Sequence, residues 1–449
     1  MDLRKSFIEG LLYPLMEKKR GNHVRAYLQD LLASEKTSAA DQHKAQQERL
    51  KELLLTCIKN VPAYRGLLTE AEISADPFAA LRKLPILTKA DFRAAPDRYM
   101  NAAFDKAARI PNQTGGSTGE PLQFFMSRYA VEHYEAARWR GLSWWGVTPG
   151  SRSIMVWGNP ADLTQNELRK HNLQEKYLKN RILVSAYALN QDQLAEYIRL
   201  FNRYQPEYFY GYATALYTLS TLLQPVKDQL HLKRLKVIVS TSETLHPEQR
   251  SVIEAVFGCK VVNEYGARDA GILAYQCPNG GMHISVENCI FEVVDPVTKA
   301  PVPDGGSGLV VITDLNNLAQ PRLRYLLGDT ATLAKARCAC GRAMPLLKSV
   351  DGREDAMFKL PNGKLVHGHF LYDIMRTFPP ISKYQLVQKD PAHGVLRLVC
   401  SDPASLDTSR LLATLGERLP GMELTLEYVP EIPRSASGKL RPAIREFAL

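Results

Sequence analysis

Apolar positions recur every three or four residues through much of the first hundred residues, and this spacing predicts helices. The clearest case is DQHKAQQERLKELLLTCIKNV, residues 41–61, which stops just before Pro62. From about Asn112 onward, short apolar runs alternate with helical stretches. The predicted strands are 153–158, 181–187, 235–241 and 259–266, and the predicted helices between them include 191–204 and 246–257. This rhythm predicts a mostly parallel sheet covered by helices, with ligands expected where the strands end.

The pattern changes near Glu287, where apolar and polar positions begin to alternate. NCIFEVVD, GSGLVVITDL and PRLRYLLGDTATL therefore predict an antiparallel subdomain. After GRED, which begins at Gly352, two further strand–helix units predict a small compact unit. We expect an α/β chain with a large N-terminal domain, residues 1–351, and a small mobile α+β domain, residues 352–449, hinged near Asp355.

Composition and charge narrow the class of protein. Hydrophobic residues make up 45% and charged residues 23% of the 449, as in an ordinary folded protein. No apolar run approaches the roughly 18 residues of a membrane span, and the N-terminal stretch lacks the cleavage site of a secretion signal, so we expect a cytoplasmic protein. The net charge is +10, but the basic residues are scattered without an aromatic ladder, which disfavours a nucleic-acid partner and still favours an anionic small molecule.

The cysteines favour a metal site over a set of disulfide bonds. An odd number without a secretion signal argues against a disulfide framework. Cys277 and His283 in CPNGGMH, with Cys338 and Cys340 in CACG, form a Cys₃His set that suits tetrahedral zinc. Such an ion would be structural, because all four positions would be filled. The alternative is that these are unligated cysteines in turns.

Five short motifs carry candidate chemistry. TGGSTGEP, from Thr114, is a bare loop that suits either a phosphate cradle or a flexible linker. NEYGARDAG follows a predicted strand, RYLLGD ends at Asp329, GRED carries Arg353 and PRSASGK ends at Lys439. Each alone also fits a turn, a salt-bridged carboxylate or a surface cation. Their order and separation favour a single site.

The ordered series resembles the core motifs of adenylate-forming enzymes, and within them the phenylacetate–coenzyme A ligase branch with its CapK-like relatives. Residues 59–68 and 209–219 also resemble stretches of that branch, so the resemblance spans nearly the whole chain. It implies the adenylate-forming fold. It also implies ATP-dependent activation of a carboxylic acid, often an aryl acid, to an acyl-adenylate, followed by transfer to a thiol such as coenzyme A.

The resemblance also implies residue roles. Lys439 would bridge the carboxylate and the α-phosphate, Asp269 would help to hold Mg²⁺ and Arg268 would lie near the α-phosphate, so these three are the expected catalytic residues. The residues implied to bind the nucleotide are Thr114, Gly115, Gly116, Ser117, Thr118, Gly119, Ser242, Glu243, Glu264, Tyr265, Gly266, Asp329 and Arg353. The implied cofactors are ATP or AMP, Mg²⁺, structural Zn²⁺ borne as in zinc-containing relatives, and coenzyme A.

Two departures from the family pattern leave alternatives open. Relatives usually carry Thr-Glu or Ser-Glu after the Tyr-Gly pair, where this chain has Arg268 and Asp269. Polar residues at Thr241 and Ser242 favour a substrate with a hydrogen-bonding group. A carrier-protein thiol, an amine and a hydroxyl are alternative acceptors, and a non-catalytic nucleotide-binding scaffold is the alternative from another class of protein. The sequence leaves a homodimer open.

Overall fold

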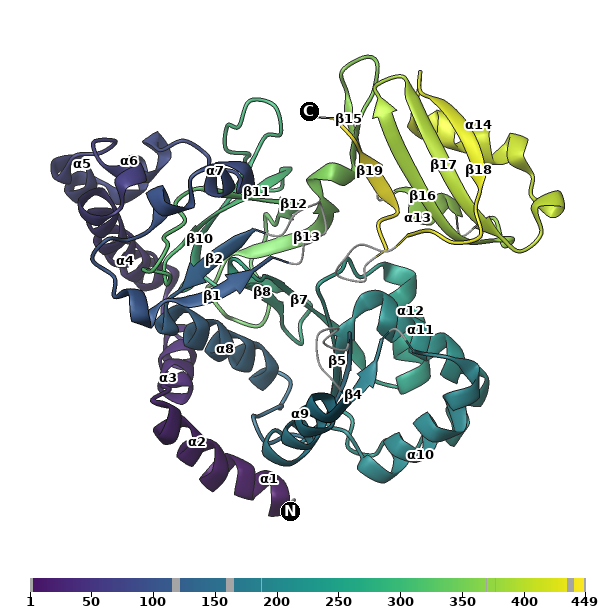
Figure 1. Cartoon of the computed structure of the whole chain (residues 1–449), viewed down its shortest axis with the longest axis horizontal. Coiled ribbons are helices and arrows are strands. Elements are labelled where there is room, and N and C mark those ends of the chain that lie inside the picture. The colour runs from purple at the N-terminus through teal and green to yellow at the C-terminus, as the bar shows by residue number, and fades with distance from the viewer. Residues whose placement is uncertain are drawn as a thin grey trace.

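The chain folds into a large N-terminal body and a smaller C-terminal unit (Figure 1). The computed structural model describes residues 3–114, 122–158, 165–186, 188–368, 370–375, 377–433 and 440–447. Among these, no helix is both long enough and apolar enough to cross a membrane.

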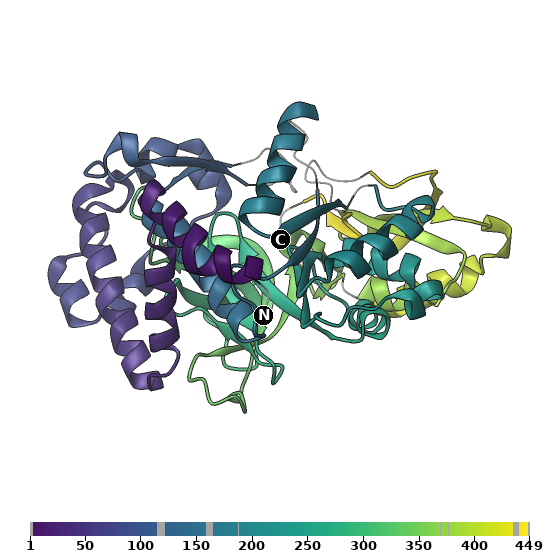
Figure 2. The ribbon, with the colours of Figure 1, turned by 90° about the horizontal axis from the view of Figure 1, so that it is seen from below.

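Helices enclose the body on several sides, as the view from below shows (Figure 2). The body helices are α1 (Leu3–Phe7), α2 (Tyr13–Arg20), α3 (Val24–Ser34), α4 (Ala39–Asn60), α5 (Glu70–Ala75), α6 (Pro77–Lys83), α7 (Lys89–Ala94), α8 (Arg128–Ser143), α9 (Gln165–Leu178), α10 (Leu194–Tyr204), α11 (Ala213–Leu223) and α12 (Pro247–Phe257). The helix predicted from residues 41–61 is present as α4. Its buried positions Leu50, Leu53, Leu54 and Cys57 follow helical spacing.

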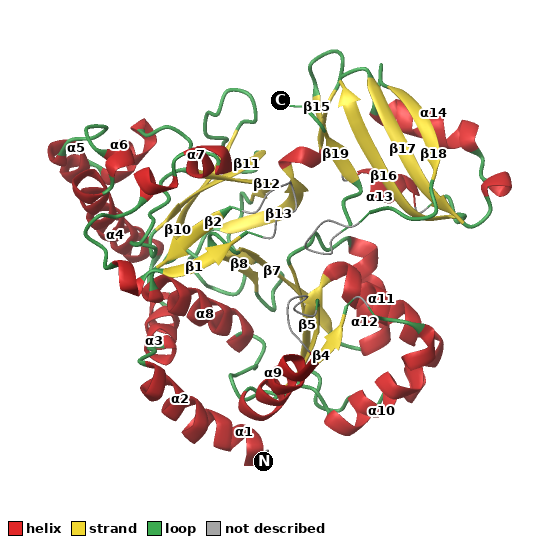
Figure 3. Cartoon of the chain, viewed as in Figure 1, coloured by secondary structure: helices red, strands yellow, loops and turns green. Residues whose placement is uncertain are grey.

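A single mixed sheet runs through the body (Figure 3). Its strands are β3 (Ser153–Trp157), β4 (Arg181–Ser185), β5 (Tyr208–Tyr212), β6 (Val237–Thr241), β7 (Lys260–Ala267), β8 (Gly271–Gln276), β9 (Met282–Ile284), β10 (Cys289–Val294), β11 (Ser307–Asp314), β12 (Tyr325–Leu333) and β13 (Leu346–Arg353). They are ordered β10-β11-β12-β13-β9-β8-β7-β6-β5-β3-β4. A separate hairpin, β1 (Ile110–Gln113) with β2 (Gln123–Met126), precedes α8.

The sheet has a parallel half and an antiparallel half that meet at β7. On one edge β7 is parallel to β6, and on the other it is antiparallel to β8. The parallel sheet and the antiparallel region expected from the sequence are therefore both present, and the antiparallel strands continue the same sheet. The α/β fold class is confirmed.

Helix α8 packs against β8 through two reciprocal contacts. A Cβ atom on Gly141 of α8 would lie 2.3 Å from the ring of Tyr275, and one on Gly271 of β8 would lie 2.3 Å from the ring of Tyr134. Gly271 also has a φ of 72°, which residues with side chains rarely adopt. Each element thus leaves room for a tyrosine ring of the other, and this fixes the height of α8 above the sheet.

The C-terminal unit has a hydrophobic core of its own. Its elements are β14 (Met357–Lys359), β15 (Leu365–His367), α13 (Phe370–Met375), β16 (Ile381–Asp390), β17 (His393–Cys400), α14 (Thr408–Arg418), β18 (Glu423–Tyr428) and β19 (Ala443–Arg445). The four-stranded sheet has the order β18-β17-β16-β19, and β14 pairs with β15. The separate core agrees with a two-domain organisation, while the boundary between residues 351 and 352 stays a prediction.

The junction between body and C-terminal unit is short. Only the turn Glu354–Ala356 separates β13 from β14. Arg441 forms an ion pair with Asp355, and the guanidinium of Arg445 donates to the backbone carbonyls of Glu354 and Met357. The turn is therefore fastened to the C-terminal unit.

Candidate functional site

A pocket lies at the carboxyl ends of β6 and β7, next to the end of β13. It contains about 540 Å³ of empty space, open solvent included. The lining residues are Ser242, Glu243, Thr244, Asn263, Glu264, Tyr265, Gly266, Asp329, Val350, Gly352 and Arg353. The structure therefore brings together in one cavity seven residues that the sequence motifs singled out, from Ser242 to Arg353.

Asp329 is held in the pocket from two sides. The hydroxyl of Tyr265 donates to Oδ2 at 2.9 Å, and Nη1 of Arg353 donates to Oδ1 at 2.7 Å. Burial opposes the charge on Arg353, but Asp329 and Asp355 outweigh it and raise the pKa of the guanidinium. Burial, followed by Asp329, raises the pKa of Tyr265, which therefore stays a hydroxyl donor. Each carboxylate oxygen of Asp329 keeps a further lone pair, so the group can accept the two hydroxyls of a ribose.

The segment after β6 is held in a strained conformation. Ser242 has a φ of 67°, in the left-handed region that non-glycine residues seldom occupy. The carboxylate of Glu243 accepts hydrogen bonds from the backbone N–H of Thr214, at 2.9 Å, and from its hydroxyl, at 2.7 Å. Glu243 therefore caps the start of α11, and this anchor offsets the strain beside the pocket.

Thr114 closes the base of the glycine-rich loop. Its N–H donates to the carbonyl of Leu122, and its hydroxyl accepts from the N–H of Leu122, both at 2.9 Å. The other expected loop residues, Gly115, Gly116, Ser117, Thr118 and Gly119, lie outside the described part of the chain, and so does Lys439.

Arg268 lies beside the entrance to the same loop. Its exposed side chain donates from Nη1 to the carbonyl of Gln113 at 3.4 Å, one residue before Thr114. A cation at this position faces the region where the sequence predicts the phosphates.

Asp269 is buried and does not line the pocket. Its Oδ2 accepts from the hydroxyl of Tyr325 at 2.8 Å and lies 4.0 Å from Nζ of Lys89. Burial opposes the charge, but Lys89 and Arg322 outweigh it and lower the pKa of Asp269. The carboxylate is already neutralised within the chain, so a Mg²⁺ ion at Oδ2 would have to displace Lys89. These contacts do not fit a ready-made magnesium ligand.

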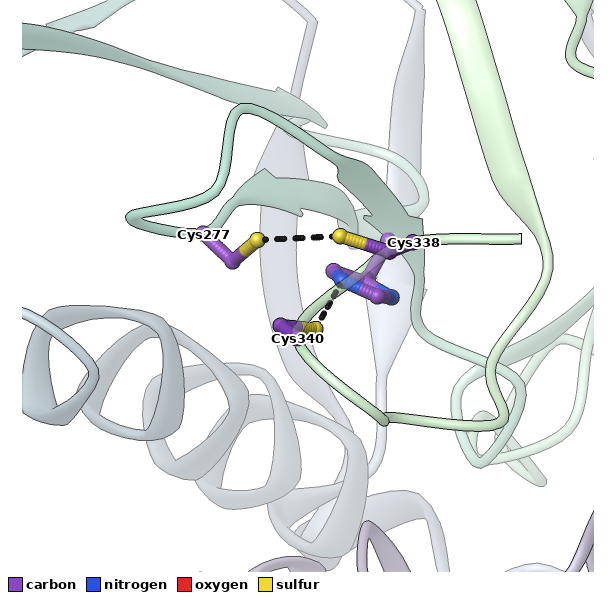
Figure 4. A group of neighbouring side chains, drawn as sticks. Cys277, Cys338 and Cys340 are labelled. Atoms are coloured by element: carbon purple, nitrogen blue, oxygen red, sulfur yellow. Dashed lines mark hydrogen bonds between the residues drawn. The ribbon is translucent and has the colours of Figure 1, made fainter. Parts of the chain in front are cut away.

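Four side chains gather at the start of β13. Cys277 Sγ lies 3.5 Å from Cys338 Sγ, and Cys340 Sγ lies 3.2 Å from Nε2 of His283 (Figure 4). The four ligand atoms all lie within 4.8 Å of one another. Zinc–sulfur bonds of about 2.3 Å in a tetrahedron place ligand sulfurs roughly 3.8 Å apart, so the spacing fits zinc.

The backbone around these four residues is shaped to the cluster. A Cβ atom on Gly281 would lie 2.6 Å from Cys338 Sγ and 3.3 Å from His283 Nε2. Burial lowers the pKa of His283 to about 4, so the imidazole is neutral at pH 7, as a ligand must be. His283 pairs with Leu346 at the start of β13, the strand that ends at Arg353. The cluster therefore holds the near end of a strand whose far end lines the pocket.

Sequence reasoning missed the partners that orient the predicted residues. Lys89 and Tyr325 face Asp269, and Thr214 binds Glu243. Tyr325 lies within RYLLGD and Thr214 within residues 209–219, but neither was expected to be a site residue, and Lys89 lies outside every motif. Asn263 also lines the pocket and was not expected to. It is the first residue of the NEYGARDAG motif, so it would have been found if the whole motif had been assigned to the site.

Comparison with known proteins agrees with this geometry. The model of the AMP-binding enzyme family matches residues 182–319, and that of the CapK C-terminal domain matches residues 358–446. Protein CapK of Staphylococcus aureus is 24% identical over 91% of this chain and 90% of its own length. A phenylacetate–coenzyme A ligase of Thermus thermophilus is 26% identical over 88% of this chain and 94% of its own length.

Among solved structures, a 2-hydroxyisobutyryl-CoA ligase in complex with R3-HIB-AMP superimposes with a TM-score of 0.69 at 19% identity, covering 92% of this chain and 91% of the other. The fold is thus that of an AMP-binding enzyme. The two family models and these relatives together support the adenylate-forming superfamily, and within it the branch that contains CapK and the phenylacetate–coenzyme A ligases.

Proposed function

We propose that this protein is an AMP-forming acid–thiol ligase. A carboxylate oxygen of the acid attacks the α-phosphorus of ATP and pyrophosphate leaves, giving an acyl-adenylate. The sulfur of a thiol, coenzyme A in the first instance, then attacks the acyl carbon and AMP leaves. The observation that carries the proposal is the single pocket that joins Ser242, Tyr265, Asp329 and Arg353.

The body residues would orient the nucleotide. Asp329, aligned by Tyr265 and Arg353, would accept the ribose hydroxyls. Arg268, at the entrance to the loop that begins after Thr114, would place a positive charge near the phosphates. Because the acid and the nucleotide are both anions, fixed positive charge and exact placement are what lower this barrier.

Lys439 would supply the mobile charge. By the resemblance it bridges the acid carboxylate and the α-phosphate in the first half-reaction. An ammonium on a long flexible stem suits a group that must approach for one step and withdraw for the next. ATP is expected to bring Mg²⁺ with it, and coordination by Asp269 stays a prediction that requires Lys89 to move.

The Cys₃His cluster would hold a structural Zn²⁺. Cys277, His283, Cys338 and Cys340 would fill all four positions, leaving none for water or substrate. The ion would stabilise the connection that leads into β13 and thus the position of Arg353.

Because the substrates of the proposed ligase are ATP and coenzyme A, we expect the enzyme to act in the cytoplasm.

Exchange of labelled pyrophosphate into ATP tests the first half-reaction. We expect exchange that depends on added acid, with a panel of aryl and alkyl acids, Mg²⁺ and folded protein. No exchange with any acid would favour a nucleotide-binding scaffold and overturn the proposal. Thioester formation with coenzyme A is followed by mass spectrometry. Exchange without a thioester would support adenylation but would indicate a different acceptor: a carrier-protein thiol, an amine or a hydroxyl.

A further inference from the structure

Neighbouring residues near the end of β7 face two different parts of the body, the nucleotide pocket and helix α8. Successive strand side chains point to opposite faces, and Tyr265 reaches Asp329 while Glu264 reaches toward α8. Glu264 is 2% exposed. Its Oε1 accepts from the hydroxyl of Tyr210 at 2.6 Å and of Thr241 at 3.3 Å. Its Oε2 is buried and accepts no hydrogen bond from the described chain.

Arg138 of α8 faces this carboxylate. Its Nε lies 3.6 Å from Oε2 of Glu264, and its Nη1 donates to Glu135 at 2.8 Å. The guanidinium carbon lies 5.8 Å from the ring centre of Tyr210. Nε is buried without a hydrogen-bond partner in the described structure, yet the side chain as a whole keeps 36% of its area exposed. A charged group between a helix and the strand ends, with spare donors and open area, is placed to meet a ligand.

A group of three aromatic side chains begins at Tyr210, over which Arg138 stands. Trp157 and Tyr212, the last residues of β3 and β5, have ring centres 4.1 Å apart, and Trp157 lies 5.9 Å from Tyr210. Trp157 and Tyr212 stand at the carboxyl ends of parallel strands, where ligands of such sheets bind, and Tyr210 lies two residues before the end of β5. Glu264 lines the nucleotide pocket as well, so the two spaces adjoin.

The charges select the kind of group that fits. Two carboxylates, Glu135 and Glu264, face one guanidinium, so the surroundings carry one excess negative charge. A second carboxylate on the ligand is therefore disfavoured. A hydroxyl can accept a hydrogen bond from Arg138 and donate one to a glutamate, which satisfies both kinds of spare valence at once.

We propose that Arg138 and Glu264 recognise the end of the acid remote from its reacting carboxyl, and that the substrate is an aromatic acid carrying a hydroxyl group at that end. This inference rests on the proposed function. An acid without the hydroxyl leaves the buried polar groups unpaired, so we expect it to be used roughly ten- to a hundredfold less efficiently. Arg138 and Glu264 are specificity-determining residues rather than catalytic ones, because the reacting atoms lie on the nucleotide side.

The test compares phenylacetic and benzoic acids with their ring-hydroxylated and ring-carboxylated analogues. Pyrophosphate exchange gives kcat/KM, and calorimetry gives the affinity of each acid for the full-length protein. We expect the best hydroxylated acid to exceed its parent by at least about tenfold. In Arg138→Met and Glu264→Gln the ratio should fall toward one. Arg152→Met is the matched control, because Arg152 also stands over a tyrosine ring but at the opposite end of the sheet, and its ratio should not change.

The outcomes separate the two proposals. Exchange without any preference for a hydroxyl, or a preference that survives in Arg138→Met and Glu264→Gln, overturns this inference and leaves the ligase proposal standing. Hydroxyl-dependent binding without exchange supports the inference and overturns the ligase proposal. If neither exchange nor hydroxyl-dependent binding is found, the inference and the ligase proposal are both overturned. If the two variants fail to fold, Tyr210→Phe, which removes the 2.6 Å hydrogen bond to Oε1 of Glu264 and leaves only the 3.3 Å one from Thr241, should raise KM for the hydroxylated acid only. An equal rise for both acids counts against the inference.

Discussion

Asp329 and Arg353 stand directly opposite each other on β12 and β13, with Nη1 of the guanidinium 2.7 Å from Oδ1 of the carboxylate. The residue that would hold the ribose is thus oriented by the last residue of β13, which is followed at once by the turn into the C-terminal unit. One ion pair connects the nucleotide pocket with the junction.

Asp329→Asn should weaken AMP binding roughly ten- to a hundredfold. The amide keeps the shape of the side chain but loses the charge-assisted hydrogen bonds and leaves Arg353 with less compensation. Calorimetric titration with AMP measures the effect. Asp351→Asn is the control, because Asp351 lies on β13, the strand that pairs with β12, but accepts from Ser307 and Thr332 rather than from Tyr265 and Arg353. Equal losses in both variants would contradict the proposed role of Asp329.

Lys439→Ala should reduce acid-dependent pyrophosphate exchange by roughly a hundredfold or more, while the affinity for ATP changes little. The reason is that the ammonium is expected to act on charge that develops during the reaction rather than on the bound nucleotide. Exchange kinetics and calorimetry on the same preparation check this. A parallel loss of binding and exchange would count against a role limited to adenylation.

The purified protein should contain about one equivalent of zinc, and removing it should lower the melting temperature. Cys340→Ser should have the same effect, because the hydroxyl cannot replace the thiolate. Cys400→Ser is the control, since Cys400 lies in the C-terminal unit away from the cluster. Elemental analysis that finds less than half an equivalent would remove the zinc assignment.

Folding stability should decline as the pH falls from 6.5 toward 4, and His133 should account for part of this decline. Burial, followed by the charge of Arg49, lowers its pKa to about 4, and its Nδ1 lies 2.8 Å from the amide oxygen of Asn288. A folded-state pKa below the unfolded value of about 6.5 gives stability that is present above pH 6.5 and is lost as the pH falls through 4. The contribution is about 3 kcal/mol.

Urea unfolding at several pH values tests this by comparing His133→Gln with the unchanged protein. Subtracting the two free energies of unfolding at each pH removes the contributions of all other groups. The free energy of unfolding of the variant should therefore depend less steeply on pH between pH 6.5 and 4. His43→Gln is the control, because His43 is an exposed residue of α4. Identical slopes for His133→Gln and the unchanged protein would contradict the assignment.

The sequence predicts the elements that repeat a simple period. The buried strands β3, β6 and β7 and the amphipathic helices α4, α10 and α12 lie where the apolar pattern indicates. In the C-terminal unit the pattern predicts two strand–helix units, but β16, β18 and β19 were not anticipated. Strand β19 has only three residues, too few to show a period, whereas β18, ELTLEY, alternates polar and apolar residues and could have been predicted from that pattern.

The candidate site is predictable as motifs and much less so as contacts. Tyr265 and Asp329 stand out because they end strands within recognisable motifs, whereas the ion pair between Asp269 and Lys89 depends on where α7 packs. A single sequence gives the period of a helix but not the strand that it will face. The same holds for Arg138, whose position opposite Glu264 follows from the height of α8 above the sheet.

Gly352 has a φ of 132°, and a Cβ atom there would lie 2.8 Å from the ring of His367. The turn that follows is bound to the C-terminal unit by Arg441 and Arg445, so the last residues before it are Gly352 and Arg353, which pair with Thr330 and Asp329 of β12. Both residues line the pocket, so we expect that any rotation of the C-terminal unit relative to the body starts at the pocket wall and that a bound nucleotide restricts it.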